Sequence, residues 1–233
     1  MNQPLLSRIG VIVSLMGSLI AAANSKCGAK KEMEPKQKGR AMTSPREVAI
    51  KLLQATSLPD DNVFVNQTIP MNTLVDYYRI ACNILFVCER CGTCCITGNP
   101  IRLSQEDISR IAKYLKVPLN KAIKKLTNPD PAQSGVLNFK KVNPCKFYDM
   151  VQKGCKIYDA RPWSCRIFPF IGIYGSEDQI KIHESCPGSV KAVKALTNAV
   201  EELRSDPDFP LSFDLDTVKD AKQYFKDVLS AIR

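Results

Sequence analysis

The sequence has little that could cross a membrane or bind a nucleic acid. The uncharged run that follows Arg8, residues 9–23, has 15 residues, whereas a membrane-spanning helix needs roughly 20. The formal net charge is +10, but lysines and arginines are spread thinly and form no basic stripe. Residues 1–50 alone hold eight of them against three acidic residues, so half of the excess lies near the N-terminus. We therefore find no clear nucleic-acid-binding signature.

Cysteine is not rare, but it is unevenly spread. The 233 residues include ten cysteines, a density below that of small proteins built on disulfides. With 45% apolar residues, the chain is also long enough to form a core without such cross-links. Eight of the cysteines lie within 88–186, and none follows. This clustering indicates a chemical site and not a scaffold.

The first 43 residues are predicted to be a signal-like or disordered segment. Residues 9–23 end in three alanines, and a signal peptidase prefers small residues at its cleavage site. The alternative is that the lysine-rich stretch 24–43 belongs to an upstream extension of the functional chain. A genuine signal would make the protein exported, or membrane-associated through a weak tether at 9–23.

From Ser44 onward the pattern is that of a single domain, 44–233, which is mainly helical. A Ser-Pro-x-Glu sequence at Ser44 predicts a capped helix start, and Ser104 with Asp107 predicts a second one. Apolar periodicity predicts further helices at 72–85, 117–126, 190–203 and 218–232, and short strands at 136–142 and 170–183. We expect an α+β fold in which helices frame an irregular cysteine-rich centre with a small antiparallel sheet or hairpin.

The stretch CERCGTCC places four cysteines in eight positions: Cys88, Cys91, Cys94 and Cys95. Cys-x-x-Cys is the spacing at which a tight turn directs two thiolates at one metal, as in zinc knuckles, and here it occurs twice in succession. Three cysteines so spaced also match the pattern that wraps an iron-sulfur cube, although the usual fourth ligand and its following proline do not appear at the usual distance. Gly92 leaves the turn free to adopt a left-handed conformation.

The doubled cysteine at the end of this stretch bears on how the sulfurs are divided. Successive side chains of an extended chain point apart, so Cys94 and Cys95 are expected to serve different metals, or one ligates while the other packs. Eight cysteines suffice for two four-sulfur sites, or for one cluster plus a structural zinc. The second half of the set follows later in the chain: Cys145, Cys155, Cys165 and Cys186.

Four other residues bear on the site. Arg161 and Arg166 lie on either side of a cysteine, and their planar guanidinium groups could bind cluster sulfurs or a substrate carboxylate. The alternative is that they pair with acidic residues and hold the loop. His183, the only histidine, could add a ligand or be an ordinary surface or core residue. Cys82 falls near the apolar stripe of a helix and is predicted to be a buried core side chain.

These motifs resemble the YkgJ-type cysteine cluster family, which is described as zinc- or iron-chelating. The family signature is CxxCxxCC followed by cysteines in the contexts PC.F, C.IY..RP..CR.FP and CPG. Here these read CERCGTCC, PCKF, CKIYDARPWSCRIFPF and CPG. The resemblance covers about 86–190 and leaves 189–233 as a helical C-terminal extension. It implies metal ligands at Cys88, Cys91, Cys94, Cys95, Cys145, Cys155, Cys165 and Cys186.

The spacing and the resemblance together predict a metal-binding protein that holds zinc or an iron-sulfur cluster, for example of the 4Fe-4S type. An enzyme is the alternative, either an iron-sulfur oxidoreductase or a relative of the lysine N-methylases that some cluster-bearing proteins resemble. The chain has neither a glycine-rich methyltransferase loop after a strand nor the CxxxCxxC spacing of radical enzymes. Whether it is an enzyme stays open.

A further alternative is an exported protein held by disulfides. The crowding of CxxCxxCC disfavours it, because bridged Cα atoms lie about 4.4 to 6.8 Å apart with converging side chains. Metal thiolates also favour the cytoplasm, since an oxidising compartment would pair the sulfurs before metal binds.

Overall fold

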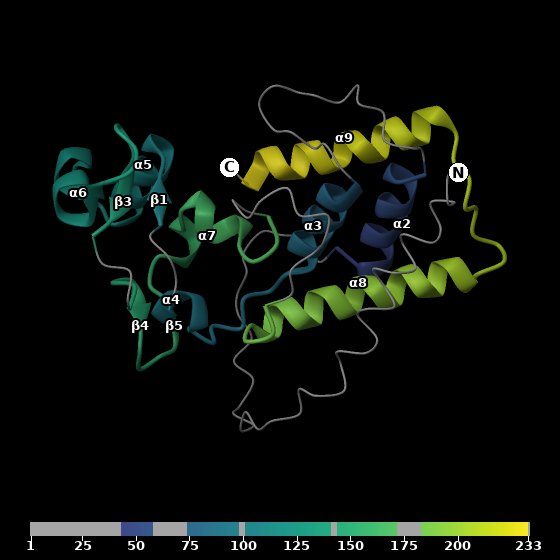
Figure 1. Ribbon diagram of the computed structural model, residues 1–233, viewed down its shortest axis with the longest axis horizontal. Helices are drawn as coiled ribbons and strands as arrows, with labels where there is room; N and C mark the ends of the chain where they lie inside the picture. The colour runs from purple at the N-terminus through teal and green to yellow at the C-terminus, as the bar shows by residue number, and fades with distance from the viewer. Residues whose placement is uncertain (1–42, 58–73, 98–100, 141–143, 172–182, 233) are drawn as a thin grey trace.

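The computed structural model describes residues 43–57, 74–97, 101–140, 144–171 and 183–232. The described chain is mainly helical with two small antiparallel sheets, which confirms the predicted α+β class (Figure 1). The helices are α2 (Pro45–Ala55), α3 (Leu74–Leu85), α4 (Thr93–Thr97), α5 (Gln105–Tyr114), α6 (Leu119–Leu126), α7 (Trp163–Ile167), α8 (Pro187–Ser205) and α9 (Leu215–Ile232), with a 3-10 turn η3 (Tyr158–Ala160). The strands are β1 (Arg102–Leu103), β2 (Thr127–Pro129), β3 (Leu137–Phe139), β4 (Tyr148–Asp149) and β5 (Gly154–Cys155).

Both predicted capped helix starts are confirmed. The hydroxyl of Ser44 accepts the backbone N–H of Glu47, whose carboxylate accepts the N–H of Ser44 in return. Ser104 and Asp107 repeat this capping box at the start of α5. Each box satisfies backbone donors that a helix start leaves unpaired, so these two boundaries follow from local sequence.

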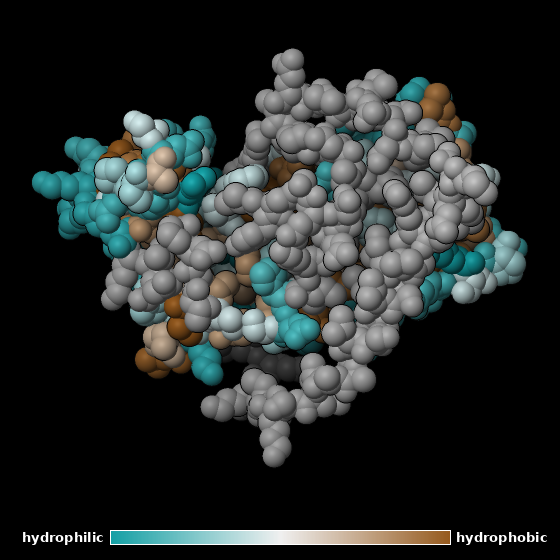
Figure 2. Space-filling model, viewed as in Figure 1, coloured by the Kyte–Doolittle hydropathy of each residue, from teal (hydrophilic) through white to brown (hydrophobic). Residues whose placement is uncertain are grey.

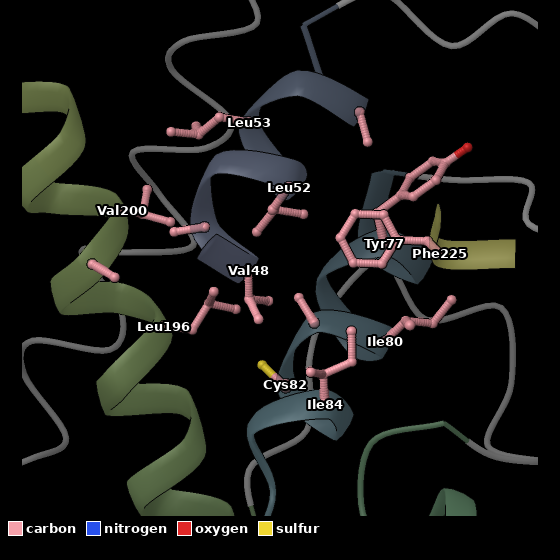
Figure 3. Close-up of a cluster of buried hydrophobic side chains, with 14 of the residues drawn as sticks. Val48, Leu52, Leu53, Tyr77, Ile80, Cys82, Ile84, Leu196, Val200 and Phe225 are labelled. Atoms are coloured by element: carbon pink, nitrogen blue, oxygen red, sulfur yellow. The ribbon is translucent and has the colours of Figure 1, made fainter. Parts of the chain in front are cut away.

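One hydrophobic core forms where α2, α3, α8 and α9 pack together, and we call it the helical core (Figure 3). Val48 and Leu52 of α2 are fully buried in it, and the ring of Tyr77 on α3 meets that of Phe225 on α9 edge to face, with 5.7 Å between centroids. Helices from the N-terminal and C-terminal parts of the described chain therefore build one shared core. Cys82 is 1% exposed in this core, which confirms its prediction as a packed side chain.

A second, smaller core lies under α5 and α6, at the left of Figure 1, and we call it the small core. It is closed by the three-stranded sheet, in which β3 is central and pairs antiparallel with β1 and β2. Ile108 and Ile111 of α5 are buried there, and Phe139 of β3 packs edge to face on Phe147 at 5.5 Å. Through Phe147 the small core extends to the segment that contains Cys145 and Cys155.

In Figure 1, α7 lies between the two cores, and α4 and the hairpin of β4 and β5 lie below α7 and the small core. The hairpin is short, with Tyr148 opposite Cys155 and Asp149 opposite Gly154. Its tip is hydrophobic and exposed, since Val151 is 92% accessible; this is the brown area at the lower left of Figure 2. The irregular, cysteine-rich centre that the sequence predicts is this middle zone.

Some predictions fall outside the described residues. These are the signal-like segment 1–43 with its possible tether at 9–23, and most of the strand pair expected at 170–183. Within the part of the chain that the structure describes, no helix combines the length and the apolar character needed to cross a membrane.

Candidate metal centre

The first two cysteines of CERCGTCC lie in a turn that leaves the end of α3. The backbone is left-handed at Arg90, with φ at 57°, and again at Gly92, with φ at 86°. The predicted conformation of Gly92 is thus confirmed. A Cβ atom at this position would overlap the phenol of Tyr148, so the site needs glycine for space as well as for backbone freedom. Cys91 lies between the two left-handed residues and is exposed.

Cys94 and Cys95 do not point apart, because the chain after Gly92 is helical and not extended. The N–H groups of Cys95 and Ile96 both bond to the carbonyl of Gly92, which starts α4. The two sulfurs lie 4.0 Å apart. Two thiolates on one tetrahedral zinc, with Zn–S bonds of about 2.3 Å, lie about 3.8 Å apart. The adjacent thiols are therefore spaced as neighbours in a metal-thiolate centre.

Their closeness also changes how they ionise. The hydrogen bond between the two thiols lowers the pKa of Cys94 to about 7 and raises that of Cys95. The hydrogen bond therefore favours ionisation of Cys94 over that of Cys95. Thiolates, not thiols, bind metals.

Cys145 and Cys155 reach the same place from the small core. The N–H of Cys145 donates to the carbonyl of Cys95 at 2.7 Å, a direct backbone link between distant parts of the chain. Cys155 stands opposite Tyr148 in the hairpin, and both cysteines pack against the small core. Their positions thus depend on tertiary contacts and not on spacing alone.

Cys165 lies in α7, a short helix held from several sides. The buried carboxylate of Asp107 accepts the N–H of Trp163 at 2.9 Å, and the hydroxyl of Ser164 donates to the carbonyl of Arg102 at 3.1 Å. At the other end of α7, the amide of Asn83 donates to the carbonyls of Arg166 and Ile167. Burial raises the pKa of Cys165 to about 12, so this thiol needs a partner before it loses its proton.

Cys186 precedes α8 and faces the loop of the first cysteines. Three contacts hold the start of α8 there. Lys191 pairs with Glu89 at 2.6 Å, and the hydroxyl of Thr93 donates to the carbonyl of Ser185 at 3.3 Å. A Cβ atom at Gly188 would overlap the carbonyl of Val87, so helix and loop touch backbone to backbone.

Backbone N–H groups surround the sulfurs. Burial raises the pKa of Cys88, Cys145, Cys155 and Cys186, and in each case a nearby amide opposes this effect. The donor follows its cysteine by two or three residues, as in metal-binding turns. The donors, in the order of the four cysteines, are Arg90, then Phe147 with Tyr148, then Ile157, then Ser189.

Of the two arginines predicted for the site, the structure brings Arg161 to the sulfurs. Its guanidinium stacks on the ring of Tyr158 at 3.6 Å and donates to the carbonyl of the same residue at 2.9 Å. The largest influence on the pKa is burial for Cys88, Cys155 and Cys165, and the hydrogen bond with Cys95 for Cys94. The positive charge of Arg161 makes a smaller contribution, which lowers the pKa of all four thiols. Arg166 instead donates to the carbonyl of Ile232 at 2.9 Å, at the end of α9.

All eight predicted cysteines thus lie in one neighbourhood, where each of them affects, or is affected by, the charge of another. Among the described residues, no three Cys, His, Asp or Glu side chains are close enough to hold one metal ion. The thiols therefore lie in one zone without forming a closed set of metal ligands. The ring of His183 packs on that of Phe168 at 4.9 Å, and Cys82 stays in the helical core.

Sequence reasoning missed two residues that shape the centre. Tyr148 lies against Gly92, and its pKa is raised by burial and then by the charges of three cysteines, Cys95 first. Asp107 was predicted only as a helix cap, yet it also anchors α7. Neither role has a local signal, because each depends on segments that are distant in sequence.

Comparison with known proteins relates the cysteine-rich part of the chain to a zinc- or iron-chelating family. An uncharacterised protein of Methanocaldococcus jannaschii is 35% identical over 88 residues, which are 37% of this chain and 46% of that protein. The chain thus spans about half the length of this relative. No solved structure matches. Residues 87–187 match the model of the CxxCxxCC family, described as "Putative zinc- or iron-chelating domain". The resemblance read from the motifs is confirmed over residues 87–187, which are similar to the CxxCxxCC family.

Proposed function

We propose that the protein binds zinc or an iron-sulfur cluster through the thiolates of eight cysteines: Cys88, Cys91, Cys94, Cys95, Cys145, Cys155, Cys165 and Cys186. The observation that carries this proposal is their convergence from five separate segments of the chain onto one zone between two hydrophobic cores. Nothing in the packing of either core requires so many sulfurs together, since hydrophobic side chains would fill the space without polar cost.

The residues present fit a metal in their chemistry. Thiolates are ligands for zinc and for iron-sulfur clusters, and the 4.0 Å between the sulfurs of Cys94 and Cys95 suits neighbours in such a centre. The amides beside four other cysteines and the guanidinium of Arg161 offset the negative charge that several thiolates would bring together. All nine described cysteines are free thiols.

A bound metal would supply free energy to order the zone between the cores, where the described strands are only two or three residues long. We propose a cytoplasmic location as part of the same hypothesis, because a reducing compartment keeps thiols available for metal. Among the residues that the structure describes, no contact favours an oxidoreductase or a methylase over a protein that only binds metal, and we propose neither reaction.

The test is the metal content of the full chain purified without oxygen. Iron, zinc and acid-labile sulfide are measured per chain, together with free thiols. Iron with matching sulfide, or zinc without colour, supports the proposal and identifies the group. Protein that has no metal, takes up neither metal from solution and has lost its free thiols would overturn it in favour of disulfides.

A further inference from the structure

We propose that the eight sulfurs form two adjacent four-sulfur sites, with Cys88, Cys91, Cys94 and Cys186 in one and Cys95, Cys145, Cys155 and Cys165 in the other. This rests on the proposed function and adds how the ligands are divided. We call the first set the helical-core site and the second the small-core site.

The helical-core site is built from the ends of two helices of that core. Cys88 follows α3, and Cys186 immediately precedes α8. The contact between Gly188 and the carbonyl of Val87 and the ion pair of Lys191 with Glu89 clamp these two ends together. A further short chain of contacts joins the sulfur of Cys91, through the hydroxyl of Thr93, to the carbonyl of Ser185.

The small-core site is built from segments that pack on the other core. Cys145 and Cys155 lie against it, and the hairpin between them fixes their separation. The start of α7, two residues before Cys165, is held to this side by Asp107 of α5, whereas the end of α7 is held by Asn83 of α3. The fourth member, Cys95, is tied to Cys145 by the 2.7 Å bond from the N–H of Cys145 to its carbonyl.

The doubled cysteine lies where the two sites meet. With sulfurs 4.0 Å apart, Cys94 and Cys95 could share one metal or face two. Their other contacts favour two, since only Cys95 is bonded through its backbone to the later cysteines. Each site then has four thiolates, the donor set of a closed structural zinc site and also of an iron-sulfur cluster.

The experiment loads the reduced full chain with Cd²⁺, a soft ion that occupies thiolate sites, and counts bound ions by native mass spectrometry in the presence of a competing chelator. The wild type is expected to bind two. The double variant Cys94→Ser with Cys186→Ser, and the double variant Cys95→Ser with Cys145→Ser, are each expected to keep one. The crossed variant Cys94→Ser with Cys145→Ser should retain neither at wild-type affinity. Cys82→Ser is the matched control and keeps two.

A second measurement needs no variant and therefore no assumption about folding. A chelator withdraws Cd²⁺ from the wild type stepwise, and released thiols are alkylated and mapped by peptide. We expect them to be released in two groups of four with the membership given above. Release of all eight together, mixed groups, or one ion bound by the whole set would overturn the division but not the proposed function. A chain that binds no Cd²⁺, zinc or iron would overturn both.

Discussion

The carboxylate of Asp107, near the start of α5, accepts a hydrogen bond from the backbone N–H of Trp163 at 2.9 Å. Asp107 is 2% exposed, closes the capping box with Ser104 and also accepts from the guanidinium of Arg110. That guanidinium in turn donates to the carbonyl of Arg161 at 3.0 Å. A single buried acid thus holds the segment that carries both a candidate ligand and the cation beside it.

Replacing Asp107 with alanine is expected to lower the free energy of unfolding by about 3 kcal/mol, because it leaves the half-buried guanidinium of Arg110 without its carboxylate and two backbone donors without their acceptor. Urea denaturation of the reduced, metal-free chain measures this. Asp220→Ala is the control, since Asp220 is exposed on α9 and its loss should change stability by less than about 0.5 kcal/mol. Equal effects of the two variants would contradict the anchoring role.

Gly188→Ala is expected to weaken metal binding although it improves the helix propensity of α8. The added methyl group would overlap the carbonyl of Val87 and lie 3.0 Å from the ring of Phe86, and a backbone carbonyl cannot rotate away. The start of α8 must therefore move away from the cysteine loop.

We expect a tenfold or greater loss of affinity for Cd²⁺, measured by chelator competition, which corresponds to about 1.4 kcal/mol. The control is Lys194→Ala, an exposed position one to two turns further along α8. Unchanged affinity in Gly188→Ala would show that the close approach of helix and loop does not position Cys186.

Arg161→Gln is expected to move metal binding to higher pH. The guanidinium lowers the pKa of nearby thiols such as Cys155, so its removal raises their pKa, and metal then competes with protons up to a higher pH. The midpoint of a pH titration of Cd²⁺ binding should rise by on the order of half a unit. Arg166→Gln is the comparison: it should weaken the docking of α9 and leave this midpoint unchanged.

Cys82 gives a pH effect that is independent of metal. Burial raises its pKa from 9.0 to about 12, so the folded state keeps a proton that the unfolded chain loses. The contribution of the protonated thiol to the free energy of unfolding is fully present below pH 9. It declines as the pH rises toward 12, by up to about 1.4 kcal/mol per pH unit.

Cys82→Ala should therefore unfold with a weaker pH dependence than the wild type between pH 9 and 12, and its metal content at neutral pH should not change. Urea midpoints across this range measure the difference. Parallel curves for the two proteins would mean that the thiol is not held protonated in the core.

The sequence predicted those features that short segments determine. The helix starts at Ser44 and Ser104 follow from capping boxes, which need only four consecutive residues. The burial of Cys82 follows from the apolar stripe of α3. The cysteine motifs indicated the centre because ligand spacing within a turn is also a local property.

Features that depend on distant contacts were not predictable in the same way. The prediction that Cys94 and Cys95 point apart holds only for an extended chain and is wrong here, because the carbonyl of Gly92 starts a helix that brings the sulfurs together. The division of the fold into two cores, and the place of Arg166 at the end of α9, depend on packing between segments far apart in sequence. Local periodicity contains no such information.

The pairing of helices across the helical core sets an order of assembly during synthesis. The small core contains only residues between 103 and 160, so it can form while the ribosome is still adding the rest. The helical core needs α8 and α9, which are made after all eight cysteines, before α2 and α3 are covered. Until translation has passed Ile232, the ends of α3 and α8 that hold Cys88 and Cys186 are therefore not fixed against each other. Metal delivered before then would find the segments of the small-core site already packed, but not those of the helical-core site.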